Sequence, residues 1–145
     1  MSQVRLGIVG CGAMFDTHAR GLHQLSDELE VAYTVDIVAE RARRAAAQFP
    51  GSQAATDYRQ VLDDVDAVLL VLPYHLHHPI AKECLLVGKH VLLEKPMANN
   101  EQECLDLISA AVTSSQVFMI AYCMRFHPLV VELKRLLDDA TYGDV

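Results

Sequence analysis

Short apolar runs alternate with helically spaced stretches along the whole chain. Six segments rich in Val, Leu, Ile and Ala have the length and apolar character of buried strands. Between most of them, apolar residues recur every three or four positions, which predicts helices with one buried face. The predicted strands are residues 4–9, 30–35, 53–56, 67–72, 90–93 and 117–121.

The predicted helices are bounded by residues that usually start or stop a helix. Pro50–Gly51 ends the second, Gly88 follows the third, Asn99 or Asn100 precedes the fourth, and Pro128 opens the last. The helices are residues 13–25, 38–49, 80–87, about 100–113 and a last one from 128, with a helical turn at 58–62. The expected inward residues are Met14, Ala19, Leu22 and Leu25 in the first helix, Ala42, Ala45, Ala46 and Phe49 in the second, and Leu129, Leu133, Leu136 and Leu137 along one side of the last.

Strands that alternate with crossover helices predict an α/β fold with a doubly wound parallel sheet, the Rossmann fold. The expected strand order is 3-2-1-4-5-6. No repeat, low-complexity tract or linker interrupts the pattern, so residues 1–145 are predicted to form a single domain. Ligands of such sheets bind at the carboxyl ends of the strands.

Charge and hydropathy exclude some classes of partner and cellular location. The formal net charge is −7 and the pI is about 5.4, which argues against nucleic-acid binding. The longest apolar run, Ala67–Pro73, is too short to span a membrane, and the N-terminus carries no recognisable secretion signal. We therefore expect a cytoplasmic protein whose four widely separated cysteines are reduced thiols.

Two glycines stand where the first predicted strand turns into the first helix. Gly10 and Gly12 lie in the segment GCGAMF, and glycine costs backbone entropy wherever its freedom is unused. Bare backbone there, with the N–H groups and partial positive charge of a helix N-terminus, predicts a pyrophosphate site completed by Ala13, Met14 and Phe15. The alternative is a tight turn that binds nothing.

Asp36 follows the second predicted strand, 24 residues after Gly12. A carboxylate there can accept hydrogen bonds from both adenosine ribose hydroxyls, which predicts NAD and disfavours the 2′-phosphate of NADP. Asp36 could also cap the helix 38–49, and one carboxylate could serve both purposes. Phe15 takes the third glycine position of the GxGxxG pattern, and its ring is expected to face the cofactor or a neighbouring domain rather than the core.

Two further segments carry a resemblance to a known family. They read LPYHLHHPIAKECLLVGKHVLLEKPMA at residues 72–98 and AYCMRFHPLVVELKRLL at residues 121–137. Together with GIVGCGAMFDTHARGL at residues 7–22, they resemble the N-terminal half of the glucose-fructose oxidoreductase and inositol dehydrogenase family, Gfo/Idh/MocA. The resemblance covers essentially the whole chain.

The resemblance implies an NAD(P)-dependent oxidoreductase that moves a hydride between the cofactor and a sugar, polyol or related hydroxyl compound, and a homo-oligomeric complete enzyme. It makes Lys95, between Glu94 and Pro96 in the EKP motif, the candidate catalytic residue, partly buried beside nicotinamide and substrate, and it implies that all three residues contact the cofactor. Without the motif, Lys95 would be interpreted as a surface lysine. Arg125 of the MRF segment is expected to hold the cofactor or a polar substrate, or else to be a solvated arginine.

The family pattern TPNxxH after the fourth strand is matched only in part. Pro73 and His77 match, whereas Leu72 and Tyr74 stand where the family has Thr and Asn. The resemblance still implies cofactor contacts from all four positions, with Leu72 and Tyr74 contributing backbone and ring in place of side-chain hydrogen bonds.

The remaining histidines suggest no metal site. His75, His77 and His78 with Cys84 lack the second ligand pair of a zinc site, so no metal ion is predicted. His18 and His127 are expected to form local hydrogen bonds near turns rather than to act as bases.

In the resembling family, the substrate-side aspartate and histidine lie in a second α+β domain, which we expect to be absent from this chain. Two function classes stay open. One is the cofactor half of a dehydrogenase, which the intact EKP motif favours, and the other is a nucleotide-binding module without catalysis of its own. An assembly or regulatory domain with an empty pocket is the least favoured alternative.

Overall fold

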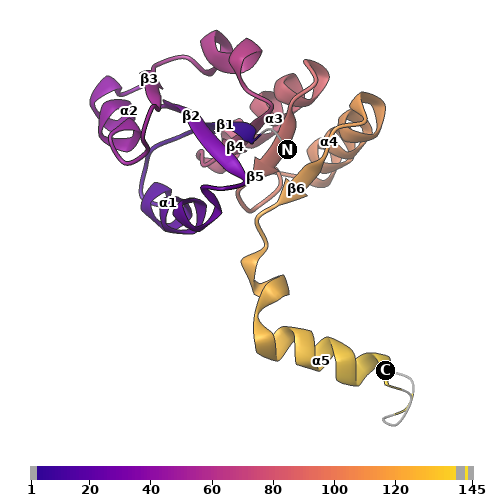
Figure 1. Ribbon diagram of the computed structural model, residues 1–145. Helices are drawn as coiled ribbons and strands as arrows, with labels where there is room; N and C mark the ends of the chain where they lie inside the picture. Colours follow the sequence, from indigo (N-terminus) through magenta and orange to yellow (C-terminus); the bar gives the residue numbers. More distant parts are fainter. Residues whose placement is uncertain (1–2, 140–142, 144–145) are drawn as a thin grey trace.

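The computed structural model describes residues 3–139 and 143. Its sheet has the predicted strand order. Its six strands are all parallel and lie in the order β3-β2-β1-β4-β5-β6 (Figure 1). The chain therefore starts in the middle of the sheet and winds outward in both directions, which confirms the doubly wound fold. The strands are β1 (Val4–Val9), β2 (Leu29–Val35), β3 (Gln53–Ala55), β4 (Ala67–Leu70), β5 (His90–Leu93) and β6 (Phe118–Ile120).

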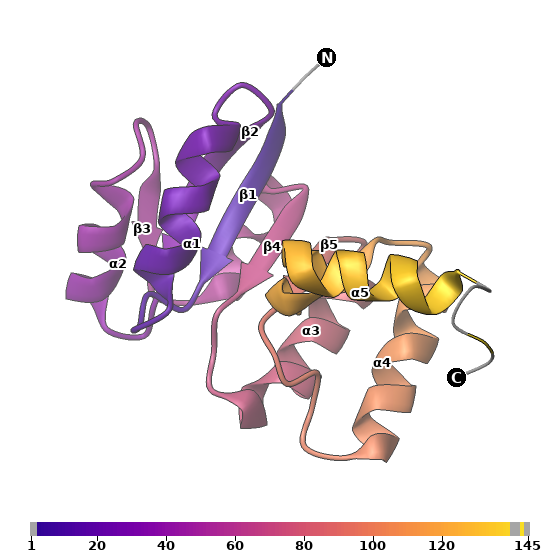
Figure 2. The same cartoon turned by 90° about the horizontal axis from the view of Figure 1, so that it is seen from below.

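Helices cover both faces of the sheet, as parallel strands buried on two sides require. One face carries α1 (Phe15–Leu22) and α2 (Ala39–Ala46), and the other carries α3 (His77–Leu86) and α4 (Glu101–Ser114) (Figures 1 and 2). The fifth helix, α5 (Pro128–Asp138), projects away from the sheet beyond β6. Short 3₁₀ turns occur at His23–Leu25, Tyr58–Asp64, Tyr74–Leu76 and Cys123–Phe126.

The core has one part on each side of the sheet. Beneath α1 and α2, the side chains of Ile8, Phe15 and Leu69 pack together and are almost fully buried. Beneath α3 and α4, Leu70 and Leu93 belong to a second cluster. Burial of a large aliphatic or aromatic side chain contributes about 1.5–3 kcal/mol, so these two clusters fix the sheet between its helices.

The structure overturns the expectation for Phe15. Its side chain is 1% exposed and makes an edge-to-face contact with Phe49, whereas Met14 and Leu25 are 45% and 41% exposed. The helix begins at Phe15, two residues later than predicted, so that Phe15 rather than Met14 takes the first inward position. Of the four residues predicted to face inward, Ala19 is buried and Leu22 is half-buried. Met14 and Leu25, at the two ends of the predicted helix, are exposed, so the prediction is wrong there.

Several element boundaries also differ from the sequence pattern. β4 ends at Leu70, and the apolar run continues as loop rather than strand; α3 begins three residues before the predicted Ile80. In α5, Leu129, Leu133 and Leu137 are exposed and no residue is buried. Within the described residues, no helix is long and apolar enough to cross a membrane.

We predict that Phe15→Ala lowers the free energy of unfolding by about 3–5 kcal/mol, because it leaves a cavity between β1 and α1. Met14→Ala, one residue earlier and largely exposed, is the matched control and should change it by less than about 1 kcal/mol. Urea denaturation measures both. Equal small losses in the two variants would show that the ring does not lie in the core.

Candidate functional site

The turn after β1 can form only with glycine at position 10. Gly10 has φ +99°, and a Cβ there would stand 2.1 Å from the carbonyl oxygen of Val71. The Gly10 N–H donates to Val35 O at 2.8 Å, and the Val71 N–H donates to Val9 O at 2.8 Å. Gly10 is thus required by the packing of three strand ends, before any ligand is considered.

Gly12 is different, because it faces open space. Apart from Gly12 and its two chain neighbours, no residue has an atom within 4 Å of the point where a Cβ would stand. Within the described part of the chain, the backbone N–H groups of Gly12, Ala13 and Met14 donate to no acceptor. These donors precede the first turn of α1, where the helix dipole adds partial positive charge, and together they could bind an anion.

Asp36 connects this turn to β2. One carboxylate oxygen accepts the Cys11 N–H at 3.0 Å, and the other accepts the Val38 N–H at 2.8 Å. The helix cap itself is Val38, so Asp36 supports the start of α2 from two residues earlier rather than as the predicted cap. Each oxygen retains a second lone pair, and a ribose hydroxyl could still donate to it.

A cleft of about 510 Å³ follows the carboxyl ends of the central strands. One side of the cleft is the glycine turn with Gly10 and Gly12. The part of the cleft beside β2 is lined by Asp36, Ile37 and Arg41. Leu72 and Pro73 line it beyond β4. Most of the remaining lining is apolar, which suits a ring system bound between strand ends. The cleft also reaches the loop between β3 and β4, where residues 56–59 contribute.

Glu83 of α3 holds that loop in place. Its carboxylate accepts hydrogen bonds from the Arg59 guanidinium at 2.6 and 2.7 Å and from the Tyr58 hydroxyl at 2.6 Å. The guanidinium also lies over the Tyr58 ring, 4.7 Å from its centre. The bonds from Arg59 first and Tyr58 second lower the pKa of Glu83, while burial and the bond to Glu83 raise the pKa of Tyr58. Sequence reasoning did not identify this group.

The EKP motif begins where β5 ends. Glu94 is buried, and one of its oxygens accepts a hydrogen bond from His18 Nε2 at 2.8 Å, while the other accepts the Lys95 N–H at 3.0 Å. His18 lies in α1, so the expectation that it bonds locally is wrong. Lys95 is exposed, not partly buried as expected, and the Lys95–Pro96 peptide bond is cis.

The other predicted site residues are distributed around this end of the sheet. His77 is 1% exposed, with both ring nitrogens directed at backbone carbonyl oxygens. Tyr74 is exposed on the 3₁₀ turn that precedes α3. Arg125 is exposed on the 3₁₀ turn that follows β6. Neither Tyr74 nor Arg125 lines the cleft, whereas Leu72 and Pro73 do.

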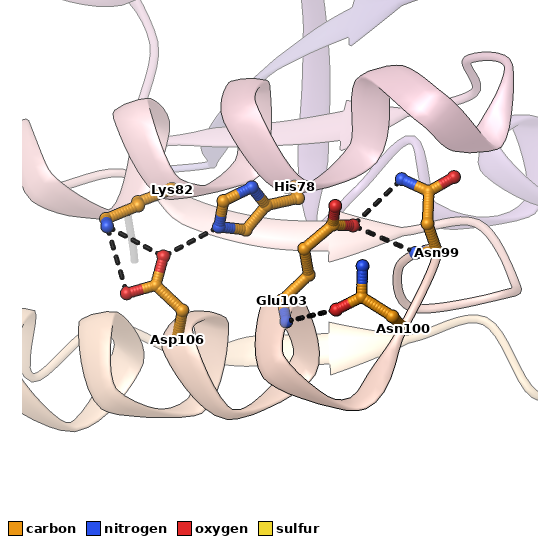
Figure 3. A network of polar contacts seen from close by, with 6 residues as sticks. All are labelled: His78, Lys82, Asn99, Asn100, Glu103 and Asp106. Atoms are coloured by element: carbon orange, nitrogen blue, oxygen red, sulfur yellow. Dashed lines mark hydrogen bonds and ion pairs between the residues drawn. The ribbon is translucent and has the colours of Figure 1, made fainter.

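A polar network joins α3 to α4 (Figure 3). Asp106 accepts hydrogen bonds from Lys82 at 2.7 and 2.9 Å and from His78 at 2.6 Å, and these bonds lower its pKa. Asn99 donates to Glu103 from its backbone and its side chain, and Asn100 caps α4 by accepting the Glu103 N–H at 3.0 Å. Both asparagines therefore fix the point where the loop after β5, which contains the EKP motif, enters α4.

Cys11 lies inside the glycine turn, but its thiol is a weak nucleophile. Its side chain is 1% exposed, and burial first, then the charge of Asp36, raise its pKa to about 12. A thiol with that pKa is protonated at neutral pH and is a weak nucleophile. All four cysteines are free thiols, so the structure contains no disulfide.

Comparison with known sequences identifies a family for most of the chain. A family model, GFO_IDH_MocA, described as an oxidoreductase family with an NAD-binding Rossmann fold, matches residues 4–122. Inositol 2-dehydrogenase 2 of Saccharopolyspora erythraea is 33% identical over 143 residues, which are 97% of this chain and 42% of that protein. A 4-carboxy-2-hydroxymuconate-6-semialdehyde dehydrogenase of Sphingobium is 32% identical over 127 residues, 86% of this chain and 40% of that protein.

Solved structures with the same fold include complexes with nicotinamide cofactors. The WlbA dehydrogenase of Chromobacterium violaceum, in complex with NADH and UDP-GlcNAcA, matches with a TM-score of 0.91 and 27% identity, covering 97% of this chain and 41% of that one. The 3-ketoreductase KijD10 of Actinomadura kijaniata, in complex with NADP, has a TM-score of 0.86 and 28% identity, covering 98% and 46%. The chain thus spans less than half the length of these proteins.

We predict that Glu83 stabilises the fold in a pH-dependent way. Because its folded-state pKa is lowered from an ordinary value of 4.5, its contribution is complete above pH 4.5 and is lost as the pH falls through the lowered pKa. At pH 7, Glu83→Gln should cost about 1 kcal/mol, a modest value because the carboxylate is partly exposed. The difference from wild type should shrink below pH 4.5.

Chemical denaturation at several pH values between 3 and 7 measures this difference. Glu40→Gln is the control, because Glu40 also pairs with an arginine, Arg43, but is highly exposed on α2. It should change stability little at any pH. If Glu83→Gln lowered the free energy of unfolding by the same amount at pH 7 and at pH 3, the lowered pKa of Glu83 would be contradicted.

Proposed function

Because the chain belongs to the Gfo/Idh/MocA oxidoreductase family, whose members share an NAD-binding Rossmann fold, we propose that it binds NAD(H) in the cleft along the carboxyl edge of its sheet. It thereby acts as the cofactor half of a dehydrogenase for a sugar, polyol or related hydroxyl compound. One observation carries the proposal. The open turn at Gly12 with its unpaired N–H groups lies in the same cleft as the carboxylate of Asp36.

The residues in the cleft fit the parts of a dinucleotide. The N–H groups of Gly12, Ala13 and Met14 would hold the pyrophosphate, and Gly12 presents no Cβ to its approach. Asp36 would accept hydrogen bonds from the adenosine ribose, since both its oxygens have lone pairs left. The adenine would lie against the wall made by residues 56–59.

The other half of the cofactor would extend toward β4 and β5, where Leu72, Pro73 and Lys95 follow the strand ends. The nicotinamide supplies the hydride acceptor or donor when it is bound. We propose Lys95 as the catalytic residue, which orients the substrate oxygen and exchanges a proton with it. Glu94 fixes the backbone of Lys95, and His18 fixes Glu94.

The proposed substrate class rests on relatives and on chain length. Inositol 2-dehydrogenases and nucleotide-sugar dehydrogenases are among the proteins that match, and this chain covers 41–42% of the two cited above. A complete substrate pocket is therefore proposed to need a second domain, and Arg125 would meet the cofactor or the substrate there. Four free thiols support a reducing, cytoplasmic setting.

We predict that the chain binds NAD more tightly than NADP, because Asp36 would repel the 2′-phosphate. The alternative is that Arg41, which lines the same part of the cleft, neutralises that phosphate. Asp36→Ala should weaken NAD binding by about 1–3 kcal/mol, since it removes charge-assisted ribose bonds and the support of the Cys11 N–H. Isothermal titration calorimetry with both cofactors measures these affinities.

Asp63→Ala is the matched control for Asp36→Ala, because it removes an exposed carboxylate outside the cleft. It should leave both affinities unchanged. Thermal unfolding of each variant separates a lost contact from a lost fold. Equal or tighter binding of NADP by the wild-type chain would contradict the assignment of Asp36.

We predict that the chain of 145 residues binds NADH but reduces no NAD in the presence of inositols, hexoses or polyols. Positioning of the substrate supplies much of the barrier reduction, and Lys95 is exposed in the structure rather than enclosed. NADH fluorescence measures binding, and absorbance at the NADH band measures turnover. Robust turnover by this chain alone would show that the active site is elsewhere or complete without a second domain.

A further inference from the structure

His77, the first residue of α3, lies between two loops that leave the sheet at its carboxyl edge. Its Nε2 is 2.8 Å from the carbonyl oxygen of Leu72, in the loop after β4, and its Nδ1 is 2.7 Å from that of Pro96, in the loop after β5. The side chain is 1% exposed. Within the described part of the chain, no other side chain hydrogen-bonds to both loops.

Proline explains why a side chain is needed at this point. The Glu94 N–H donates to Leu70 O at 3.0 Å, which is a rung of the β4–β5 ladder. In a parallel pair the next rung from the same strand comes two residues later, so the donor for Leu72 O would be residue 96. Pro96 has no N–H. The ladder must stop, and His77 Nε2 lies beside Leu72 O, where the missing donor would be.

The second nitrogen extends the same support to the EKP loop. Both partners of the ring are carbonyl oxygens, which only accept, so each contact is a hydrogen bond when that nitrogen carries hydrogen. Either neutral tautomer holds one carbonyl, and the ring with hydrogen on both nitrogens holds both. Carbonyl groups that lose both their donor and free access to water are costly, and these two contacts are partly buried, so removal of the ring would free both loops to move.

We propose that His77 is a positioning residue for the nicotinamide end of the cofactor site, an inference that rests on the proposed function. It holds Leu72–Pro73 and Lys95–Pro96 at a fixed separation, so that the two loops face the same end of the bound dinucleotide. It does not touch the cofactor, since it is buried beneath both loops. The adenosine end is held by other contacts, those of Asp36 with the Cys11 N–H and of Glu83 with Arg59.

The test compares NADH with ADP-ribose, which has the pyrophosphate and adenosine but no nicotinamide. The full chain is used as wild type, His77→Leu, His77→Gln and the control His75→Leu, which changes an exposed histidine two residues earlier. His77→Gln keeps donor hydrogens but on a single nitrogen. Calorimetry gives both dissociation constants, NADH fluorescence reports the surroundings of the nicotinamide, and thermal unfolding reports the fold.

His77→Leu should weaken NADH binding about tenfold and abolish most of the fluorescence change, while ADP-ribose binding changes less than about twofold. His77→Gln should restore part of the NADH affinity, and His75→Leu should change nothing. If His77→Leu does not fold, the selective loss of NADH affinity must appear, at smaller size, in His77→Gln.

Two results would overturn the inference, and they differ in what else they overturn. Equal losses for NADH and ADP-ribose in the folded variants, or no loss for either, would mean that His77 supports the fold generally and does not position the nicotinamide end. Failure of the wild-type chain to bind either ligand would instead overturn the proposed function, and this inference with it.

Discussion

The approach of Gly10 to the backbone of Val71 is the constraint on which the carboxyl edge of the sheet depends. A Cβ at Gly10 would overlap the Val71 carbonyl oxygen at 2.1 Å, so any side chain would push the ends of β1 and β4 apart. The same residue donates its N–H to the end of β2. Three strand ends meet at this glycine, and the cleft opens directly above them. The proposed binding of a pyrophosphate at the open space of Gly12 depends on Gly10, which makes the turn this tight.

Helix α3 then determines the shape of the cleft at both ends. Its first residue, His77, reaches the loops after β4 and β5, and Glu83, six residues later, holds the loop between β3 and β4. Between them, Lys82 and His78 fasten α3 to α4 through Asp106 (Figure 3). One rigid helix thus positions the walls that we propose for the adenosine and the nicotinamide, which explains how short loops can present a defined surface.

The sequence pattern predicted the sheet order, the turn at Gly10 and the place of Asp36 because each depends on local periodicity and on neighbouring strands. It missed contacts between residues far apart, such as His18 with Glu94, 76 positions later, because no period along the chain indicates such a partner. Phe15 was misplaced for a related reason. In the GxGxxG pattern its position is a glycine, which led to the prediction that the ring faces away from the core. Helix α1 begins two residues later than predicted, and the Phe15 ring therefore points into the core.

Amide chemical-shift mapping tests the central claim most directly, because it locates the ligand on the folded chain. The account predicts that NAD added to the ¹⁵N-labelled protein shifts the amide signals of Gly12, Ala13 and Met14 most strongly, followed by those near Asp36 and Leu72. AMP should reproduce the changes near Asp36 but not those near Leu72. Saturable shifts confined to α4 or α5, or no saturable shift at the glycine turn, would contradict it.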